Sequence, residues 1–414
     1  MFKIVKDVIL NALKHVIVLT NYVIPKNNNL WVFVSIPDYS DNSKALFEYL
    51  HNNYLSINKV WLCYEKDCPK KLRENGIQAY PHFSIRGLWN FLRARVIVTT
   101  HNDYLTLKSR RQYFVSLWHG IPLKSIGFKD PREMPTLNER IMKKIDILPT
   151  TSPFTRYLFV SSFHVPPKRV LVTGQPRTDK LFITPREKSR KLLEEILNTN
   201  LSDFKWIILY TPTYRFSEKR IDKGKLPIDV LFENVKELEL LNETLDRYNA
   251  LFIIKLHPLE EEYLKAKYQR KQKNNNVLNK YFNNIKILEN NTLKEKMVNL
   301  YDFLNSIDIL ITDYSSIYFD YLLLNRPMIF FSYDKEEYLQ SRKFILLPYE
   351  KWTPGPKAKD MKELIREIEK TLINYHTYYK KERNHMLKLI HKYMDGNSSK
   401  RILTILLRKI GLAQ

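Results

Sequence analysis

Two histidines that follow short hydrophobic runs are the side chains best suited to acid–base chemistry. His119 lies in the run S-L-W-H-G-I-P-L-K, and His257 lies in K-L-H-P. Imidazole is a good general base near neutral pH. Each histidine alone is more often a hydrogen-bonded turn residue, because glycine or proline follows it. One such motif in each half of the chain predicts a pair that faces across a cleft.

Two adjacent serines offer an anion site. Ser315 and Ser316 follow the apolar run Ile309–Thr312 and precede the segment Ile317–Leu324, which we expect to be a helix. Backbone N–H groups at a helix start, with serine hydroxyls, can bind an anion without a glycine-rich loop. Asp320 lies one turn later on the side of Ser316. The simpler alternative is a plain N-cap, for which one serine is enough.

Two further loops carry residues that suit phosphate. Arg177 lies in T-G-Q-P-R-T-D, and its planar guanidinium matches phosphate oxygens. A loop arginine is usually solvated, so this signal is weak alone. The run Y-T-P-T-Y-R contains Pro212 and Thr213 and should reach the same sheet edge as K-L-H-P. Because these strand ends show no carboxylate spacing typical of Mg²⁺ sites, we expect no metal and no cofactor.

Short strands that alternate with helices must position these loops. This alternation predicts parallel α/β sheets, and the near-continuous apolar runs of the second half are typical of strands covered on both faces. We expect two Rossmann-like domains around a central cleft, with the motifs at the carboxyl ends of strands, where such sheets bind ligands. The strands are expected at Leu30–Ser35, Lys59–Tyr64, Val96–Thr100, Tyr113–Trp118, Ile145–Leu148, Val170–Thr173, Trp206–Tyr210, Leu251–Leu256, Ile285–Leu288, Ile307–Thr312 and Met328–Ser332.

Composition and pattern divide the chain into four segments. Residues 1–28 are an amphipathic helix and lead-in, residues 29–185 and 200–380 are the two Rossmann-like domains, and residues 381–414 are basic helices that could pack back on the first domain. The Lys-, Asn- and Gln-rich stretch Lys265–Asn283 is typical of an exposed insertion.

The first segment is too short and too polar to span a bilayer, and no small-residue cleavage site follows it. An amphipathic helix of this kind either lies in the membrane interface or packs on the protein's own core. One face of the predicted helix carries Val5, Val8, Ile9, Ala12, Leu13, Val16 and Ile17.

The composition narrows the class of protein. The 414 residues include 9 glycines, and no G-x-G-x-x-G or Walker A loop is present, which argues against a P-loop NTPase or a standard NAD enzyme. The net charge of +24 indicates a polyanionic partner: nucleic acid, an anionic membrane or a phosphorylated substrate. Two cysteines are too few for a disulfide scaffold or a four-ligand zinc site, and a reduced, cytosolic setting fits best.

The motifs, taken in order, resemble the CDP-glycerol glycerophosphotransferase family. The resemblance rests on W-H-G-I-P-L-K, G-x-P-R-T-D-K-L, Y-T-P-T-Y-R, K-L-H-P, D-I-L-I-T-D-Y-S-S-I-Y-F-D-Y, R-P-x-I-F-F-x-Y-D and P-G-P, between about Asp41 and Gly396. It implies a GT-B-type fold with an acceptor domain followed by a donor domain. It also implies peripheral attachment to the cytoplasmic face of the membrane and a role in teichoic acid or capsule synthesis.

The resemblance also implies site residues. His119 and His257 would be the catalytic pair. Ile121 stands where the family usually has threonine, and Lys255 stands where arginine is common. The chain lacks the large N-terminal extension of the long polymerases, so we expect a primer or short-chain enzyme. The implied CDP-glycerol contacts are His119, Gly120, Ile121, Pro122, Leu123, Arg177, Pro212, Thr213, Lys255, Leu256, His257, Ser315, Ser316 and Asp320.

The resulting functional prediction is transfer of glycerol phosphate from CDP-glycerol to a hydroxyl of a lipid-linked acceptor, with release of CMP. The acceptor would be a polyprenyl-diphosphate-linked saccharide or a glycerol phosphate chain, met at an anionic membrane surface. CDP-ribitol or another CDP-polyol is the alternative donor, because the motifs address the pyrophosphate more than the polyol. A nucleic-acid-binding protein is the alternative of another class, and no RRM, helix-turn-helix or zinc pattern supports it.

Overall fold

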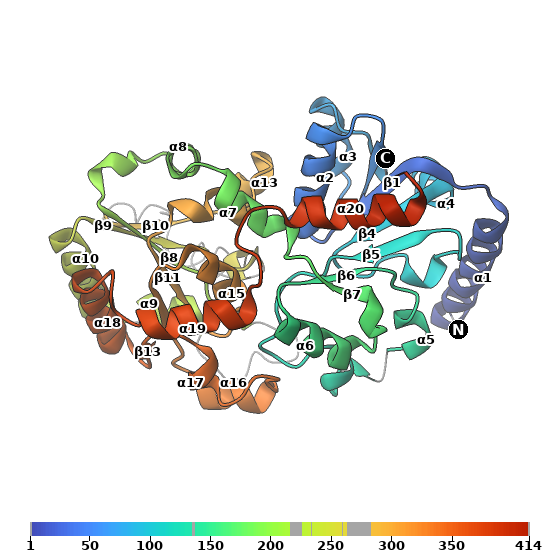
Figure 1. Ribbon diagram of the computed structural model, residues 1–414. Helices are drawn as coiled ribbons and strands as arrows, with labels where there is room; N and C mark the ends of the chain where they lie inside the picture. Colours follow the sequence, from blue (N-terminus) through green and yellow to red (C-terminus); the bar gives the residue numbers. More distant parts are fainter. Residues whose placement is uncertain are drawn as a thin grey trace. The chain divides into compact units, whose positions relative to one another are not determined.

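The computed structural model describes residues 2–134, 137–215, 226–232, 234–258, 260–262 and 283–412, with side chains from residue 12 onward. The described chain forms two compact units (Figure 1). Unit 1 comprises residues 1–120, 126–179 and 392–414, and unit 2 comprises residues 121–125 and 180–391. Most of the predicted insertion at Lys265–Asn283 lies outside the described residues.

Unit 1 is built on a five-stranded parallel sheet in the order β3-β2-β1-β4-β5. A separate parallel pair, β6-β7, adjoins it through a bridge between Val115 and Ile147. The strands are β1 (Asn27–Val34), β2 (Asn58–Cys63), β3 (Ala79–Pro81), β4 (Ala94–Thr99), β5 (Tyr113–Ser116), β6 (Leu148–Thr150) and β7 (Val170–Val172).

Two helices of unit 1 begin at serine residues that cap them. Ser84 accepts a hydrogen bond from the Gly87 N–H at the start of α4, and Ser152 forms a capping box with Thr155 at the start of α6. The C-terminal helix α20 belongs to this unit. The helices are α1 (Phe2–Val23), α2 (Asp41–Asn53), α3 (Cys68–Glu74), α4 (Ile85–Arg93), α5 (Glu139–Met142), α6 (Pro153–Phe163) and α20 (Ser398–Ile410).

Unit 2 is built on a six-stranded parallel sheet in the order β10-β9-β8-β11-β12-β13. Its central strands are apolar throughout and buried, because helices cover both faces of such a sheet. The strands are β8 (Trp206–Tyr210), β9 (Ala250–Ile254), β10 (Ile285–Ile287), β11 (Ile309–Thr312), β12 (Met328–Phe331) and β13 (Lys357–Ala358).

The apolar faces of α10 and α18 pack with these strands in one core cluster. The predicted helix Ile317–Leu324 is shorter than expected: α15 ends at Tyr321, and a 3₁₀ turn continues to Leu324. The helices are α7 (Lys180–Ile183), α8 (Arg186–Leu197), α9 (Pro227–Phe232), α10 (Val235–Arg247), α13 (Asn290–Glu295), α14 (Leu300–Phe303), α15 (Ile317–Tyr321), α16 (Lys335–Ser341), α17 (Tyr349–Trp352), α18 (Met361–Ile373) and α19 (Lys380–Ile390).

The fold-class prediction of two Rossmann-like α/β domains preceded by a helix is confirmed. Within each sheet the strand order reverses once, between β1 and β4 in unit 1 and between β8 and β11 in unit 2. Ligands of open α/β sheets bind outside the carboxyl ends of strands at such reversals. A ligand site is therefore expected at the loops that leave these strands.

Candidate active site

The histidine motif of unit 1 leaves the carboxyl end of β5. Trp118 adopts a left-handed backbone (φ 55°), which turns the chain sharply out of the strand and directs His119 away from the sheet. The His119 Nδ1 atom lies 3.3 Å from the Thr100 carbonyl oxygen, which follows β4. Because a carbonyl only accepts, Nδ1 carries the proton and Nε2 keeps its lone pair. The tautomer is that of a general base acting through Nε2.

The rings around His119 hold it neutral. The His101 ring stacks on it with centroids 4.4 Å apart, and the Trp118 ring lies 4.1 Å away. Burial, and then the neighbouring His101, lower the pKa of His119 to about 4. Burial lowers the pKa of His101 as well. An imidazole with such a pKa is uncharged at neutral pH and able to accept a proton.

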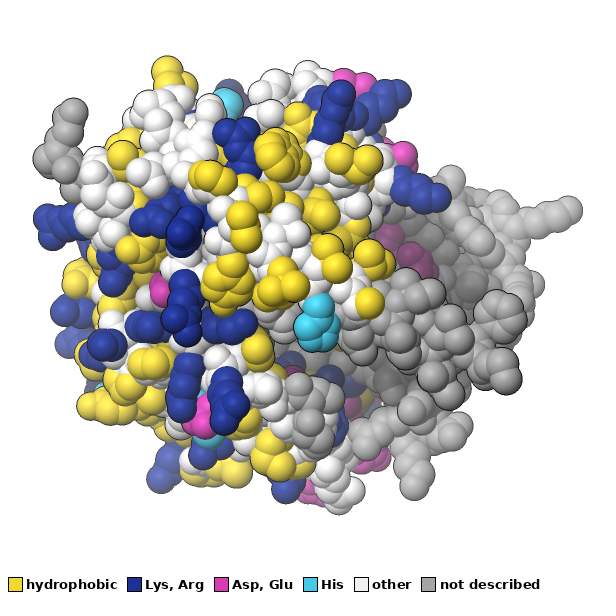
Figure 2. All heavy atoms as spheres, turned by 90° about the vertical axis from the view of Figure 1, so that its right-hand side faces the viewer, with side chains coloured by type: hydrophobic (Ala, Val, Ile, Leu, Met, Phe, Trp, Pro, Cys, Tyr) yellow, Lys and Arg dark blue, Asp and Glu magenta, His cyan; other side chains and the backbone are white. Residues whose placement is uncertain are grey.

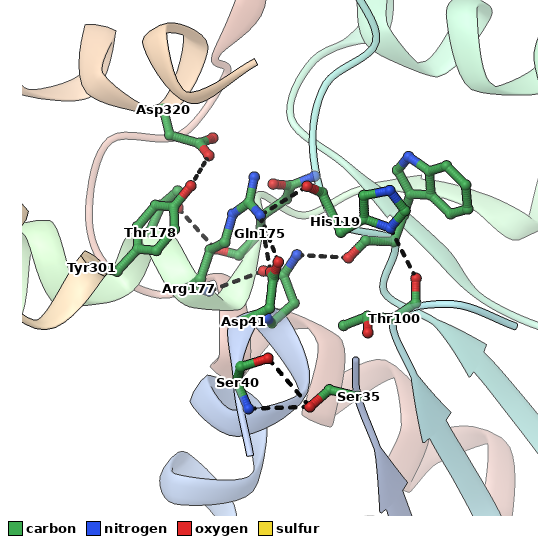
Figure 3. A network of polar contacts seen from close by, with 12 residues as sticks. Ser35, Ser40, Asp41, Thr100, His119, Gln175, Arg177, Thr178, Tyr301 and Asp320 are labelled. Carbon is green, nitrogen blue, oxygen red and sulfur yellow. Dashed lines mark hydrogen bonds and ion pairs between the residues drawn. The ribbon is translucent and has the colours of Figure 1, made fainter. Parts of the chain in front are cut away.

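Arg177 fixes the loop that carries His119 (Figure 3). Its Nη1 donates to the His119 carbonyl oxygen at 3.0 Å and to both carboxylate oxygens of Asp41 at 2.9 and 3.0 Å. The Asn42 side chain ties the same two loops, since it accepts from the Arg177 N–H and donates to the Trp118 carbonyl. Arg177 is 5% exposed. The geometry gives it a positioning role, and its predicted contact with the donor stays a prediction.

Gln175 precedes Arg177 and is fully buried. Neither amide atom of its side chain has a hydrogen-bond partner among the described residues. A buried amide without a partner is costly and requires water or a ligand to satisfy it. The neighbouring Gly174 has φ +83°, and a Cβ there would lie 2.3 Å from the Ser398 Oγ. Only glycine fits this turn, which carries Arg177 to its partners.

In unit 2, the loop after β8 is tied to the loop after β11. The Thr213 N–H donates to the Asp313 carboxylate at 2.9 and 3.0 Å, and the Thr213 hydroxyl donates to it at 2.6 Å. Asp313 is fully buried. Pro212 is also buried and precedes this contact in the chain.

Arg215 balances the acidic groups beneath this loop. Its Nη2 lies 2.8 Å from Asp313 and its Nε lies 2.7 Å from Asp334. Three tyrosine rings, Tyr314, Tyr333 and Tyr338, lie 4.8 to 5.6 Å from its guanidinium carbon. One guanidinium thus pairs with both carboxylates and offsets one of their two negative charges, which weakens the repulsion of an anion at the same sheet edge.

The K-L-H-P motif leaves β9 beside these loops. The Lys255 Nζ donates to the Asn290 side chain at 3.0 Å, and burial lowers the pKa of Lys255 to about 8. His257 is exposed, and its ring lies 4.5 Å from that of Tyr214. Burial, and then Lys255, lower the pKa of His257. Leu256 is buried, so its predicted donor contact would be made through its backbone.

The serine pair follows β11 at the other side of the reversal. Ser316 is the N-cap residue of α15 but makes no side-chain capping bond, and the Ser315 Oγ lies 3.5 Å from the Ile317 N–H. Both serines are half-buried. A weak capping contact is therefore present from Ser315, whereas the Ser316 hydroxyl makes no capping bond. Asp320 is buried, and its carboxylate accepts a 2.6 Å hydrogen bond from the Tyr301 hydroxyl (Figure 3).

Residues 121–125, which follow His119 and Gly120, belong to unit 2. Ile121, Pro122 and Leu123 are buried, and Leu123 accepts a hydrogen bond from the Ile345 N–H at 3.0 Å. Their predicted donor contacts stay predictions.

The structure thus gathers the predicted residues into two sets, one in each unit. The unit 1 set contains His119 and Arg177, and the unit 2 set contains the residues after β8, β9 and β11. Sequence reasoning missed several partners, namely His101, Asp41, Gln175, Arg215, Asn290, Tyr301, Asp313 and Asp334. Of these, His101 follows a strand as His119 does, and that position was a usable signal.

Comparison with known proteins identifies the family. The model of the CDP-Glycerol:Poly(glycerophosphate) glycerophosphotransferase family matches residues 16–408. The chain belongs to this family. It is therefore a transferase of the CDP-glycerol glycerophosphotransferase type.

Its relatives include a teichoic acid glycerol-phosphate transferase of Staphylococcus aureus, 27% identical over 90% of this chain and 92% of that protein. A teichoic acid poly(glycerol phosphate) polymerase of Bacillus spizizenii is 30% identical over 93% of both chains. A teichoic acid poly(ribitol-phosphate) polymerase of the same organism is 29% identical over 70% of this chain and 42% of its own length.

Two solved structures show the same fold. The wall teichoic acid polymerase TagF, soaked with CDPG, is 22% identical and has a TM-score of 0.77 over 99% of this chain and 97% of its own. The UDP-GlcNAc 2-epimerase of Neisseria meningitidis has a TM-score of 0.52 at 15% identity, over 93% of this chain and all of its own. These matches support the GT-B-like assignment.

Proposed function

We propose that this enzyme transfers glycerol phosphate from CDP-glycerol to a hydroxyl group of a lipid-linked acceptor in teichoic acid or capsular polymer synthesis. The observation that carries the proposal is the His119 imidazole, which is neutral and protonated on the nitrogen that faces Thr100. Family membership and the relatives named for teichoic acid synthesis support the substrates.

In the proposed reaction the acceptor hydroxyl attacks the β-phosphorus of CDP-glycerol. The His119 Nε2 takes the hydroxyl proton, the new P–O bond forms, the pyrophosphate bridge breaks and CMP leaves. Such a transfer needs positioning and stabilisation of the phosphoryl oxygens more than covalent help from the protein. Ser315, Ser316, Lys255 and His257 of unit 2 supply hydroxyl, ammonium and imidazole donors for those oxygens.

CDP-glycerol is the proposed donor, and CDP-ribitol is the alternative. A relative named for poly(ribitol-phosphate) carries a similar identity to this chain, so identity alone does not separate them. The acceptor type is also a proposal. Relatives of matching length are named transferase and polymerase, so length does not distinguish them. The expectation of a primer or short-chain enzyme therefore has no support from these relatives.

The test is CMP release from CDP-glycerol and from CDP-ribitol, with bacterial membranes as acceptor and the His119→Ala variant as control. We expect release from CDP-glycerol to exceed that from CDP-ribitol and to require both membranes and His119. Faster CMP release from CDP-ribitol would identify CDP-ribitol as the preferred donor and contradict the proposal of CDP-glycerol. Release by the variant at the wild-type rate would remove His119 from the reaction.

We also propose that unit 1 binds an anionic membrane surface through α1 and α4. In α1, Ile17 and Val18 pack on the unit 1 core, whereas the side chains of other apolar residues are exposed. Helix α4 contacts α1 and adds further exposed apolar residues beside Arg86 and Arg93. Figure 2 shows this side of the molecule, where hydrophobic side chains lie between Lys and Arg. The exposed apolar residues are Leu13, Val16, Leu19, Val23, Ile85 and Trp89.

The described turns of α1 support this proposal, because they pack on the core with one face and expose apolar side chains on another. Val5, Val8 and Ile9 lie where side chains are not described. No helix within the described residues is long and apolar enough to cross a membrane. Each basic residue near an anionic leaflet contributes about 1 kcal/mol to binding. Attachment by this surface is therefore peripheral and sensitive to salt.

The measurement is cosedimentation with anionic and neutral liposomes. We expect binding to anionic liposomes, partial release by high salt, and loss of binding when Leu13, Val16 and Leu19 are replaced by serine. The matched control replaces Val235 and Leu240 of α10, which are exposed apolar residues of unit 2. Equal binding to neutral and anionic liposomes would reject the electrostatic part, and equal binding by the serine variant would reject the surface.

A further inference from the structure

Three metal-ligating side chains meet at the carboxyl ends of β1 and β2, outside the sets described above. Asp38 follows β1, Cys63 ends β2, and Cys68 begins α3. Their ligand atoms all lie within 4.8 Å of one another. In the part of the chain that the structure describes, no other three His, Cys, Asp or Glu side chains meet this closely.

The chemistry of this group suits a borderline-soft divalent cation. Two thiolates and one carboxylate are ligands that zinc accepts, whereas Mg²⁺ and Ca²⁺ require oxygen ligands throughout. The cysteines have the spacing C-x₄-C, which falls within the range of zinc sites. Neighbouring ligand atoms of a tetrahedral zinc site lie about 3.3–3.8 Å apart, so small side-chain rotations bring these atoms into place.

The surrounding backbone already orients the carboxylate. The Tyr64 N–H lies 2.9 and 3.1 Å from the two Asp38 oxygens, and the Glu65 N–H donates to one of them at 2.8 Å. Metal ligands in proteins are typically fixed by such outer hydrogen bonds. Both cysteines are buried, and Asp38 is half-buried. The group is thus formed in advance and still lies close to the surface.

We propose that Asp38, Cys63 and Cys68 bind one zinc-class divalent cation, with a fourth position for water or another ligand. The bound cation would restrain the loop between β1 and α2. That loop is folded by hydrogen bonds from Ser40 to Ser35 and Pro37, and it leads directly to Asp41, the partner of Arg177. The site would therefore stabilise the segment that positions the His119 loop.

Co²⁺ is a suitable probe, because Cys63 and Cys68 are the only cysteines of the chain and any thiolate-to-cobalt absorbance must arise from them. The full-length protein is reduced, stripped with a chelator and titrated with Co²⁺. We expect about one Co²⁺ per chain with near-ultraviolet charge-transfer absorbance, displaced by Zn²⁺. Zn²⁺ should also raise the Tm of the wild-type protein.

The variants Cys63→Ser and Cys68→Ser should weaken Co²⁺ binding by tenfold or more and lose the Tm increase. Asp67→Asn changes an exposed carboxylate in the loop between Cys63 and Cys68. It is the matched control and should bind Co²⁺ as the wild type does. Cys68→His, which keeps a ligand, should retain binding with a shifted spectrum. This variant separates loss of a ligand from failure to fold.

The proposal is overturned if the reduced wild-type protein shows no charge-transfer absorbance, or if Cys63→Ser binds Co²⁺ as tightly as the wild type. Rapid loss of both thiols in air, with no cobalt band in the reduced protein, would identify a disulfide-forming pair instead. None of these readouts depends on transferase activity, so failure here leaves the proposed function untouched.

Discussion

The site loops of unit 1 and those of unit 2 provide different electrostatic environments. In unit 1 the loops after β4 and β5 place His119 between the rings of His101 and Trp118, which keeps the imidazole uncharged. In unit 2 the loops after β8, β9 and β11 carry Arg215, Lys255 and two serines, and Arg215 forms ion pairs with the two acidic groups beneath them. The first environment suits proton removal and the second suits anion binding.

The same type of parallel sheet supports both proton removal and anion binding, because the loops at the strand ends carry different residues. Each sheet reverses its strand order once, and each set of loops flanks that reversal. A buried stack of rings lowers a pKa through desolvation, whereas a network of paired charges keeps a buried carboxylate from repelling an anion. If the two sets of loops have these separate roles, substitutions in each set should affect different measured quantities.

The largest effect is expected for His119→Ala. Removal of a general base lowers turnover by about 10²–10⁴-fold. The steady-state rate of CMP release measures this, with His376→Ala as control, because His376 is an exposed histidine of unit 2. A variant that folds normally and retains near wild-type turnover would contradict the assignment of His119.

The second prediction concerns the anion site. Ser315→Ala combined with Ser316→Ala should raise the Kd for CDP-glycerol by about tenfold or more, since each hydrogen bond to a charged group contributes about 1.5–3 kcal/mol. The Tm should change little, because Ser316 makes no capping bond and the Ser315 Oγ accepts a hydrogen bond from the Ile317 N–H only at the long distance of 3.5 Å. Calorimetry gives the Kd, and Ser202→Ala, an exposed serine, is the control. An unchanged Kd would exclude both hydroxyls from donor binding.

The third prediction is a pH dependence of donor affinity. Burial lowers the pKa of Lys255 to about 8, so its ammonium group loses its proton as the pH rises through that value. The Kd for CDP-glycerol should therefore rise several-fold between pH 7 and pH 9. Lys255→Arg, which stays charged, should abolish this change. If the arginine variant shows the same pH dependence, another group causes it.

The smallest effect is expected for the turn before Arg177. Gly174→Ala introduces a left-handed strain of about 1–2 kcal/mol and a clash with Ser398, whose Cβ lies 3.1 Å from the added atom. Gly411→Ala introduces the strain alone, because among the described residues no heavy atom beyond its chain neighbours and its own helix backbone lies within 4 Å of the added atom. The free energy of unfolding should fall further for Gly174→Ala. Equal losses would show that Ser398 moves aside without cost.

Much of this fold could be predicted because strands buried on both faces appear as continuous apolar runs. The strands at Lys59–Tyr64 and Met328–Ser332, for example, occur within a residue of their expected positions. The strands β3 and β13 contain three and two residues, too few for a hydrophobic pattern, and were missed. The start of β6 shifted by three residues, because the apolar run at Ile145–Leu148 first forms a turn and a bridge.

The site was predictable only where a motif follows a strand. His119, His257 and the serine pair were singled out in this way, and the structure places them after β5, β9 and β11. The partners that tune them lie far away in the sequence: Asp334 is 119 residues from Arg215, and Asp41 is 136 residues from Arg177. A single sequence contains no signal for such pairing. The positioning role of Arg177 was hidden for the same reason, since its burial depends on those distant contacts.

The pH profile of kcat/KM for CMP release tests the central claim most directly, because it reports the ionisations of the free enzyme. A neutral His119 with a pKa of about 4 and a Lys255 with a pKa of about 8 predict a broad plateau between these values. The account therefore predicts a nearly constant kcat/KM from pH 5.5 to 7.5 and a fall above pH 8. A kcat/KM that falls tenfold for each unit by which the pH is lowered below about 6.5 would contradict this prediction, because His119 would then titrate as an ordinary solvated histidine.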